Sequence, residues 1–204
     1  VSALMQRTIP PQTLIKAAFT VKDGEACPPE ELERALVRCG YTRCEQVEGA
    51  GQFSRRGGIV DFFSPSYPEP VRIEFWGDDI DSMGFFDVKT QRRTESVEAC
   101  RILPAAESLA TLATGGTEAL TEALTAAADK CSRHKSSQQL RELEQTLRTD
   151  IERLRQSVKL EYADRYMPFL YEKASGADFI PEEAVVFIDQ PPRCADRARG
   201  FVKQ

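Results

Sequence analysis

The sequence predicts an α+β protein, with a small, mainly antiparallel sheet and one helix, then a helical segment, then part of an α/β domain. Three observations support this class. Between about residues 41 and 104, apolar and polar residues alternate in short runs separated by turn sequences, which is typical of antiparallel hairpins. From 117 to about 158, apolar residues recur every three or four positions, as in amphipathic helices. Residues 184–189, AVVFID, form a continuous apolar run of the kind found in buried parallel strands.

The overall composition is that of a globular protein whose whole surface is not built to bind a polyanion. The 204 residues are 41% hydrophobic and 29% charged, and the formal net charge is -5, so any contact with nucleic acid needs a local basic patch. No apolar run approaches the roughly 20 residues that span a bilayer, and no secretory signal is recognisable. The chain starts with VSALMQRTIPP and stops at ARGFVKQ within a helix-like pattern, so we expect a piece of a longer protein.

The first elements are expected to be a strand over 13–25 and a short helix after it. The helix begins near Pro28 and Pro29, which suit a first turn, is favoured by Glu30 at the positive end of its dipole, and stops at Gly40. Further strands follow, and the glycines can interrupt the second of them. The expected ranges are 42–48, 51–63, 70–76, 80–88 and 94–102.

The segment from 117 to about 158 predicts two helices. Thr117 is the expected N-cap of the first, and the two would form an antiparallel hairpin joined at SRHKSS, residues 132–137. The second helix carries one apolar stripe, formed by Leu140, Leu143, Leu147, Ile151 and Leu154. A partner-binding helix is one interpretation, but a helix that lies on its own domain is favoured. Beyond it we expect the strand over 184–189 and a helix from about 193.

No residue pattern in the chain predicts catalysis. The only histidine, His134, sits in the polar turn between the two helices, a poor place for the base of a nucleophile. Neither a G-x-x-x-x-G-K-[ST] loop nor a G-x-G-x-x-G fingerprint occurs. GAGQFSRRGG is rich in glycine, but it leads into a strand, whereas a phosphate cradle needs a helix N-terminus behind it. We therefore expect no enzyme activity and no cofactor in this chain.

Metal binding is likewise not predicted. The six cysteines contain no C-x-x-C pair, so buried or free thiols in a reducing cytoplasm are the favoured interpretation. Asp78, Asp79 and Asp81 offer three carboxylates close together, but neighbouring strand residues point to opposite faces. A Gly-Asp-Asp hairpin turn is therefore favoured over a cation site.

The arginines and the only tryptophan suggest a protein-docking surface. Alternation places Val71, Ile73 and Phe75 in the core, which leaves Arg72 and Trp76 on the outward face. Arg55 and Arg56 must point opposite ways, and the pattern alone does not say which faces outward. Arginine and tryptophan are enriched among interface hot spots, so the face would suit a partner that bears carboxylates. A solvated strand face whose tryptophan is covered by a loop is an equal alternative.

The run GYTRCEQVEGAGQFSRRGGIVDFFSPSYPEPVRIEFWGDDIDSMGFFDVKTQRRTESVEACRILPAAE, 40–107, resembles the N-terminal, UvrB-like module of bacterial transcription-repair coupling factors. The combination of GQFSRRGGIVDFF, RIEFWGDDIDS and FDVKTQR is specific. VSALMQRTIPP and YADRYMPFLYEKASGADFIPEEAVVFID also resemble that family, so only about 108–158 is generic. The resemblance divides the chain into the end of a preceding α/β domain with a linker, a UvrA-binding domain like domain 2 of UvrB, a helical segment and part of a degenerate, helicase-like α/β domain. Their expected ranges are 1–18, 19–106, 107–160 and 161–204.

The resemblance implies a function for the module and its parent. The parent would be a cytoplasmic, bacterial, ATP-dependent double-stranded-DNA translocase that uses Mg and ATP in other domains, displaces stalled RNA polymerase and recruits nucleotide excision repair. The module would bind UvrA through Arg56, Arg72 and Trp76, with Arg55 and Glu74 as a possible rim. In the family, this face is masked by another domain. This sequence lacks that domain, so we expect the face to be exposed.

The sequence departs from the family at three positions. Trp76 stands where phenylalanine is common, Arg55 adds a charge, and Gly84 replaces a common arginine. Two alternatives remain. One is a fragment of the excinuclease B subunit. The other is a nucleic-acid-binding module that uses Arg55, Arg56, Arg72, Arg92 and Arg93.

Overall fold

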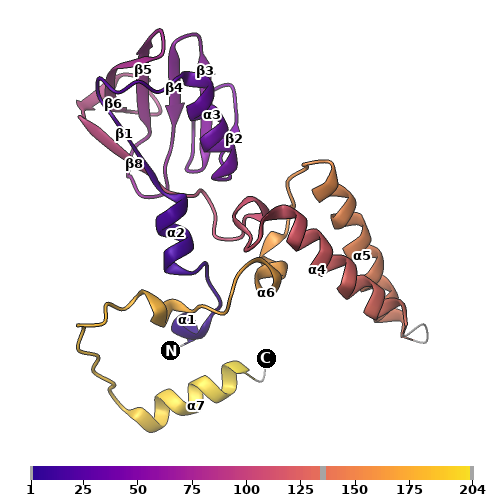
Figure 1. The fold of residues 1–204 in the computed structure, drawn as a ribbon. Helices are drawn as coiled ribbons and strands as arrows, with labels where there is room; N and C mark the ends of the chain where they lie inside the picture. Colours follow the sequence, from indigo (N-terminus) through magenta and orange to yellow (C-terminus); the bar gives the residue numbers. More distant parts are fainter. Residues whose placement is uncertain (1, 134–136, 203–204) are drawn as a thin grey trace. The chain divides into compact units, whose positions relative to one another are not determined.

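The computed structural model describes residues 2–133 and 137–202, which fall into two compact units. The first, which we call the sheet unit, is Leu14–Leu112. The second, the helical unit, is Val1–Thr13 together with Ala113–Gln204. The α+β class predicted from the sequence is confirmed, because the chain combines a six-stranded mixed sheet with helices (Figure 1).

The sheet unit is built on one six-stranded sheet in the order β2-β3-β4-β5-β6-β7. Only the β2–β3 pair is parallel, and every other neighbouring pair is antiparallel. The strands are β2 Thr42–Arg43, β3 Gln52–Arg56, β4 Ile59–Phe62, β5 Val71–Trp76, β6 Asp79–Phe86 and β7 Arg93–Ser96. A separate antiparallel pair joins β1, Phe19–Lys22, to β8, Ala99–Ile102. The central strands are thus linked by short connections, as the turn sequences predicted.

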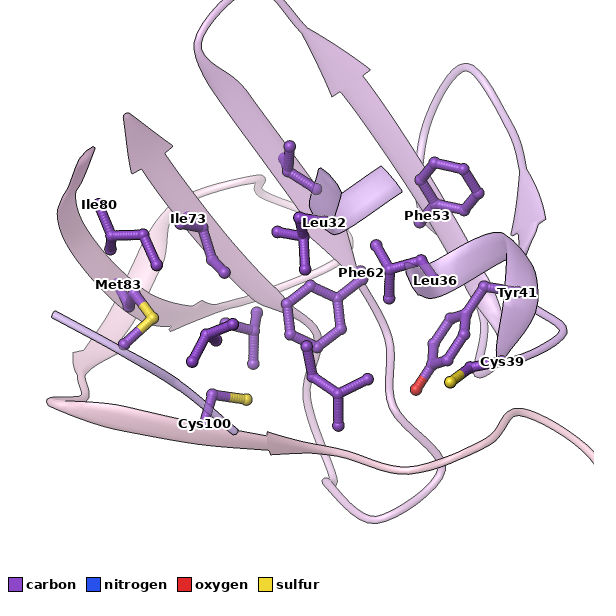
Figure 2. Packing of buried hydrophobic residues seen from close by; sticks show 14 residues of the cluster. Leu32, Leu36, Cys39, Tyr41, Phe53, Phe62, Ile73, Ile80, Met83 and Cys100 are labelled. Atoms are coloured by element: carbon purple, nitrogen blue, oxygen red, sulfur yellow. The ribbon is translucent and has the colours of Figure 1, made fainter. Parts of the chain in front are cut away.

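One helix covers one face of this sheet and closes the core. Helix α3, Pro29–Arg38, begins with a proline in its first turn and two glutamates near its positive end. Its Leu32 and Leu36 are buried among the strand side chains (Figure 2), in one cluster with Phe62 and Ile73. The β1–β8 pair adds further buried residues to the same cluster. The face covered by α3 is called the core face below, and the opposite face of the sheet is called the outer face.

Several predicted strand boundaries change in the structure. The 51–63 run is interrupted at Gly57–Gly58, where β3 and β4 form a hairpin, as the glycines allowed. The predicted strand over 13–25 was wrong in its first half, because α2, Pro11–Ala17, is a helix that starts at a proline. The predicted 94–102 strand is two strands in different sheets. The 42–48 strand is reduced to the two residues of β2, after which the backbone turns.

The helical unit contains the predicted helical hairpin. Helix α4, Gly116–Ser132, and helix α5, Gln138–Arg155, lie side by side (Figure 1). Part of the predicted stripe, Leu147, Ile151 and Leu154, is buried, whereas Leu143 is exposed. The first helix begins one residue before Thr117, and its N-cap is Gly115. His134 of the predicted turn lies outside the described residues.

Short helices complete both units. They are α1 Ser2–Met5, η1 Ala110–Leu112, η2 Ala163–Tyr166, α6 Met167–Leu170, η3 Gly176–Phe179 and α7 Pro191–Val202. Asp150 of α5 is buried and accepts a hydrogen bond from the Tyr166 hydroxyl at 2.7 Å, which fixes η2 against α5. Burial, together with this bond to a carboxylate, raises the pKa of Tyr166.

The predicted strand over 184–189 is not formed in the structure. Val185, Val186, Phe187 and Ile188 lie in irregular backbone and are exposed. An isolated strand leaves its backbone N–H and C=O groups unpaired, and no strand of the described residues pairs with this segment. The helix expected from about 193 begins at Pro191. Within the described residues, each helix is too short or too polar to cross a bilayer.

Candidate protein-docking site

The strand register places the predicted contact residues on the outer face. Asp61 of β4 pairs with Ser54 of β3 on one side and with Arg72 of β5 on the other. Directly paired residues in a sheet share a face, and so do residues two apart along a strand. Arg56, two residues after Ser54, therefore lies on the same face as Arg72. Val60 and its partner Ile73 lie on the core face, where both are fully buried.

Trp76 stands on the outer face at the tip of a hairpin, because the preceding residue, Phe75, packs against the core. A two-residue turn, Gly77–Asp78, joins Trp76 to Asp79, with Gly77 at φ +63, where an L side chain is strained. The side chain of Trp76 is 82% exposed, far more than is usual for the largest apolar residue type. The turn chemistry predicted for GDD is confirmed.

The β3–β4 hairpin reaches the same end of the sheet, beside Trp76. Its turn residues are Gly57, at φ +60, and Gly58. The amide of Phe75 donates to Gly58 O at 2.8 Å, and a Cβ on Gly58 would meet Phe75 O at 3.1 Å. The paired glycines therefore serve a tight turn and a close approach of two backbones. On the outer face, Ile59 lies between Arg56 and Glu74, with which it pairs.

Asp61 is the residue of this face that the sequence analysis missed. Its side chain is only 1% exposed although the face is not covered by α3. Arg72 binds it with two bonds, Nε to Oδ1 at 2.7 Å and Nη2 to Oδ2 at 2.8 Å. Arg56 Nη2 reaches the same Oδ2 at 3.3 Å. A carboxylate within an apolar strand sequence, IVDFF, flanked by strands with arginines, was the available signal.

Arg72 is less accessible than its outward position predicted. Its side chain is 16% exposed, and its guanidinium lies 4.6 Å from the ring centroid of Phe86. Nη1 donates to Gln91 O and Nη2 to Gln91 Oε1, both at 3.3 Å. The hydrogen bonds to Asp61 raise the pKa of Arg72 above its usual value. A partner can therefore reach only the rim of this guanidinium unless Gln91 moves.

Arg56 is the accessible arginine of the pair. Its side chain is 55% exposed, and Asp61 is its one side-chain partner among the described residues. Most of the N–H groups of its guanidinium thus face solvent. A guanidinium with free donors in a fixed fork can bind a carboxylate with two parallel bonds.

Arg55, expected as a possible rim residue, lies on the core face instead. It pairs with Val60 across the hairpin and reaches helix α3, where Nη1 donates to Glu33 at 2.8 Å and Nη2 to Glu30 at 2.6 Å. These bonds, that to Glu33 first, raise the pKa of Arg55. The first arginine of GQFSRRGG therefore links β3 to α3 and is turned away from the outer face.

Glu74, the other predicted rim residue, lies on the outer face and pairs with Arg93. Arg93 Nη2 is 3.2 Å from Glu74 Oε1 and 3.0 Å from Ser82 Oγ. The side chain of Arg93 crosses Gly84, since a Cβ there would lie 3.0 Å from Arg93 Cδ and 2.5 Å from Glu95 O. Gly84 thus makes room for an arginine that arrives from the neighbouring strand.

Within the described residues, no group of three or more His, Cys, Asp or Glu side chains is placed to hold a metal ion. The six cysteines are unpaired thiols, and burial raises the pKa of Cys100 to about 11, which keeps this thiol protonated and unreactive.

Known proteins resemble this chain in sequence. Residues 19–107 match the family model described as the UvrB interaction domain, so the sheet unit is a UvrB interaction domain, a protein-interaction module. The chain is also similar to transcription-repair-coupling factors. Identity is 30% over 204 residues with that of Bacillus subtilis (99% of this chain, 17% of the relative). It is 40% over 111 residues with that of Myxococcus xanthus (54% and 9%), and 38% over 107 residues with that of Escherichia coli (52% and 9%).

The chain is therefore homologous to the region of transcription-repair-coupling factor that carries its UvrB interaction domain. It spans less than a fifth of the length of these relatives.

Proposed function

We propose that the outer face of the sheet unit is the surface through which this chain binds UvrA, the excision-repair protein. The observation that carries the proposal is the placement of Arg56, Arg72 and Trp76 on one face, with Trp76 82% exposed at a hairpin tip. The match to the UvrB interaction domain supports an interaction role for this unit. Arg55 is not part of the surface, because it is bound to α3 on the other face.

The proposed surface offers one apolar contact, Trp76, and two charged contacts, Arg56 and Arg72. Trp76 would fill an apolar recess on the partner, where a buried aromatic side chain contributes most of the binding free energy of a small interface. Arg56 would bind a partner carboxylate with its free N–H groups. Arg72 would add positive charge and its rim to the same carboxylate, while Glu74 and Arg93 border the surface as an ion pair.

The parent protein is proposed from the relatives that share this region. We infer a bacterial, cytoplasmic transcription-repair coupling factor, an ATP-dependent translocase on double-stranded DNA that displaces stalled RNA polymerase. In that protein 19–106 would recruit UvrA, 107–160 would be a helical segment, and 161–204 would belong to an α/β domain. ATP and Mg would act in motor domains elsewhere, since the resemblance assigns no cofactor to this region.

The proposal is tested by titrating UvrA with the chain and its single variants. Trp76→Ala and Arg56→Ala should each weaken binding by at least about tenfold, the usual scale of a hot spot. Arg34→Ala is the matched control for charge, because Arg34 is an exposed arginine of α3, which covers the other face. Unchanged affinity of the Arg56→Ala and Trp76→Ala double variant for UvrA would refute the proposal.

The same titration should be run with duplex DNA. Arg55, Arg72 and Arg93 are each paired with a carboxylate of this chain, so weak binding that falls steeply with salt is expected. Tight binding that resists salt would instead favour the nucleic-acid-binding alternative.

A further inference from the structure

Two arginines from different strands converge on one buried carboxylate at the centre of the outer face. Asp61 lies on β4, between Arg56 at the end of β3 and Arg72 on β5. It receives two bonds from Arg72 and one from Arg56. Its side chain is 1% exposed, whereas that of Arg56 is 55% exposed. A macromolecular partner can therefore touch Arg56 while Asp61 stays covered.

The charge of Asp61 decides whether the two arginines can stay together. Two guanidinium groups this close repel each other, and in a partly buried setting the repulsion is weakly screened. One carboxylate between them leaves a local charge of plus one and accepts hydrogen bonds from both arginines. Ordering a long side chain at an interface costs conformational entropy, so a pair that is already held loses less freedom when a partner docks.

We propose that Asp61 is a positioning residue of the docking surface: it holds Arg56 beside Arg72, so that one partner carboxylate meets a preformed pair, and it does not touch the partner itself. The proposal rests on the proposed function, since it concerns the same face. It explains a buried charge on the side of the sheet away from the main core, where an apolar residue would pack at lower cost.

The test is a double-mutant cycle on UvrA binding with Asp61→Asn, a substitution of nearly equal shape that removes the charge. D61N alone should weaken binding about tenfold, although it makes the face more positive. Arg56→Ala should weaken binding at least about tenfold in the native chain but less than about threefold in the D61N chain, because Arg56 is then no longer held. Equal or tighter binding by D61N, or a full effect of Arg56→Ala in its background, would overturn the proposal.

Two further measurements separate positioning from loss of fold. Val60→Ala removes buried volume on the core face of the same strand, so it should lower stability and leave UvrA affinity unchanged. The side-chain Nε–H of Arg72, bound to Asp61 at 2.7 Å, should exchange slowly with solvent in the native chain and rapidly in D61N.

The variants distinguish misfolding of D61N, failure of the proposed function and failure of the positioning role. If D61N does not fold, the D61N and Arg72→Gln double variant removes both charges of the pair, and Arg56→Ala should then cost less than about threefold in that background. A full effect there contradicts the positioning role. If the native chain does not bind UvrA at all, the proposed function fails. If it binds and D61N binds equally well, only the positioning proposal fails.

Discussion

Arg72 contributes both to the stability of the fold and to the proposed docking surface. Alternation along β5 points it away from the core, yet the side chain is 16% exposed and forms a two-bond pair with Asp61, which is 1% exposed. An outward position alone would predict that variants of Arg72 leave the fold intact. The structure corrects this, since a variant would leave a carboxylate buried without its main partner.

Arg72→Ala should therefore lower the free energy of unfolding by about 3 kcal/mol, the scale for breaking a buried ion pair from one side. Arg56→Ala should change it by less than about 0.5 kcal/mol, because that side chain is more than half exposed. Urea unfolding followed by circular dichroism measures both. Equal stability of the two variants would contradict the assignment of Asp61 and Arg72 as a buried pair.

At the scale of elements, α3 is attached to the β3–β4 hairpin by charge as well as by its apolar stripe. Leu32 and Leu36 enter the core, and Arg55 reaches over from β3 to Glu30 and Glu33. The same hairpin therefore carries a structural arginine on one face and a proposed contact arginine on the other. The strand geometry requires this division, because neighbouring residues point to opposite faces.

Arg55→Ala should loosen α3 without affecting docking. We expect faster hydrogen exchange of the α3 amides and a modest fall in the urea midpoint, smaller than that of Arg72→Ala, because surface ion pairs contribute little to global stability. UvrA affinity should stay unchanged. A loss of affinity as large as that of Arg56→Ala would return Arg55 to the docking surface.

Local turn chemistry explains which elements could be predicted. Gly77–Asp78 marks a hairpin by sequence alone, whereas Gly57–Gly58 indicated only a break in the 51–63 strand, which is a second hairpin. The alternation in VRIEFW correctly placed Val71 and Ile73 in the core. The strand over 184–189 failed because a strand needs partners, which an apolar run does not supply. The prediction of a single strand over 94–102 was wrong, because the division into β7 and β8 depends on the pairing of β8 with β1, which is far away in the chain.

The sequence predicted only part of the site. Period-two alternation places Arg72 and Trp76 on one face, but it does not say which of Arg55 and Arg56 joins them. That choice depends on the register of β3 against β4, which sets Ser54 opposite Asp61. The role of Asp61 required knowing three neighbouring strands at once, and the sequence alone does not give their order.

At the scale of the whole molecule, buried weak acids make the stability of the sheet unit fall at alkaline pH. Tyr41 and Cys100 belong to the same core, and the Tyr41 hydroxyl donates to Leu103 O at 2.8 Å. Burial raises the pKa of Tyr41 from 10.0 to about 12 and that of Cys100 from 9.0 to about 11. The folded chain therefore keeps both protons at pH values where the unfolded chain has released them.

Stability should fall as the pH rises through 9 to 12, because the unfolded chain then binds fewer protons than the folded chain. Each two-unit rise in pKa corresponds to about 3 kcal/mol that is progressively lost. Urea midpoints at increasing pH measure this. The Tyr41→Phe and Cys100→Ala double variant should show a shallower fall, and a flat native profile to about pH 11 would contradict the burial of these groups.

The central claim, that the outer face docks UvrA through Trp76, is tested most directly by fluorine NMR. Trp76 is the only tryptophan of the chain, so labelling with 5-fluorotryptophan gives one signal that reports on the docking face alone. Unlabelled UvrA should shift and broaden this signal as a solvent-exposed ring becomes buried. Arg56→Ala should move the midpoint to higher UvrA concentration, and Arg34→Ala should not. A signal that stays unchanged while the chain is demonstrably bound to UvrA would contradict the claim.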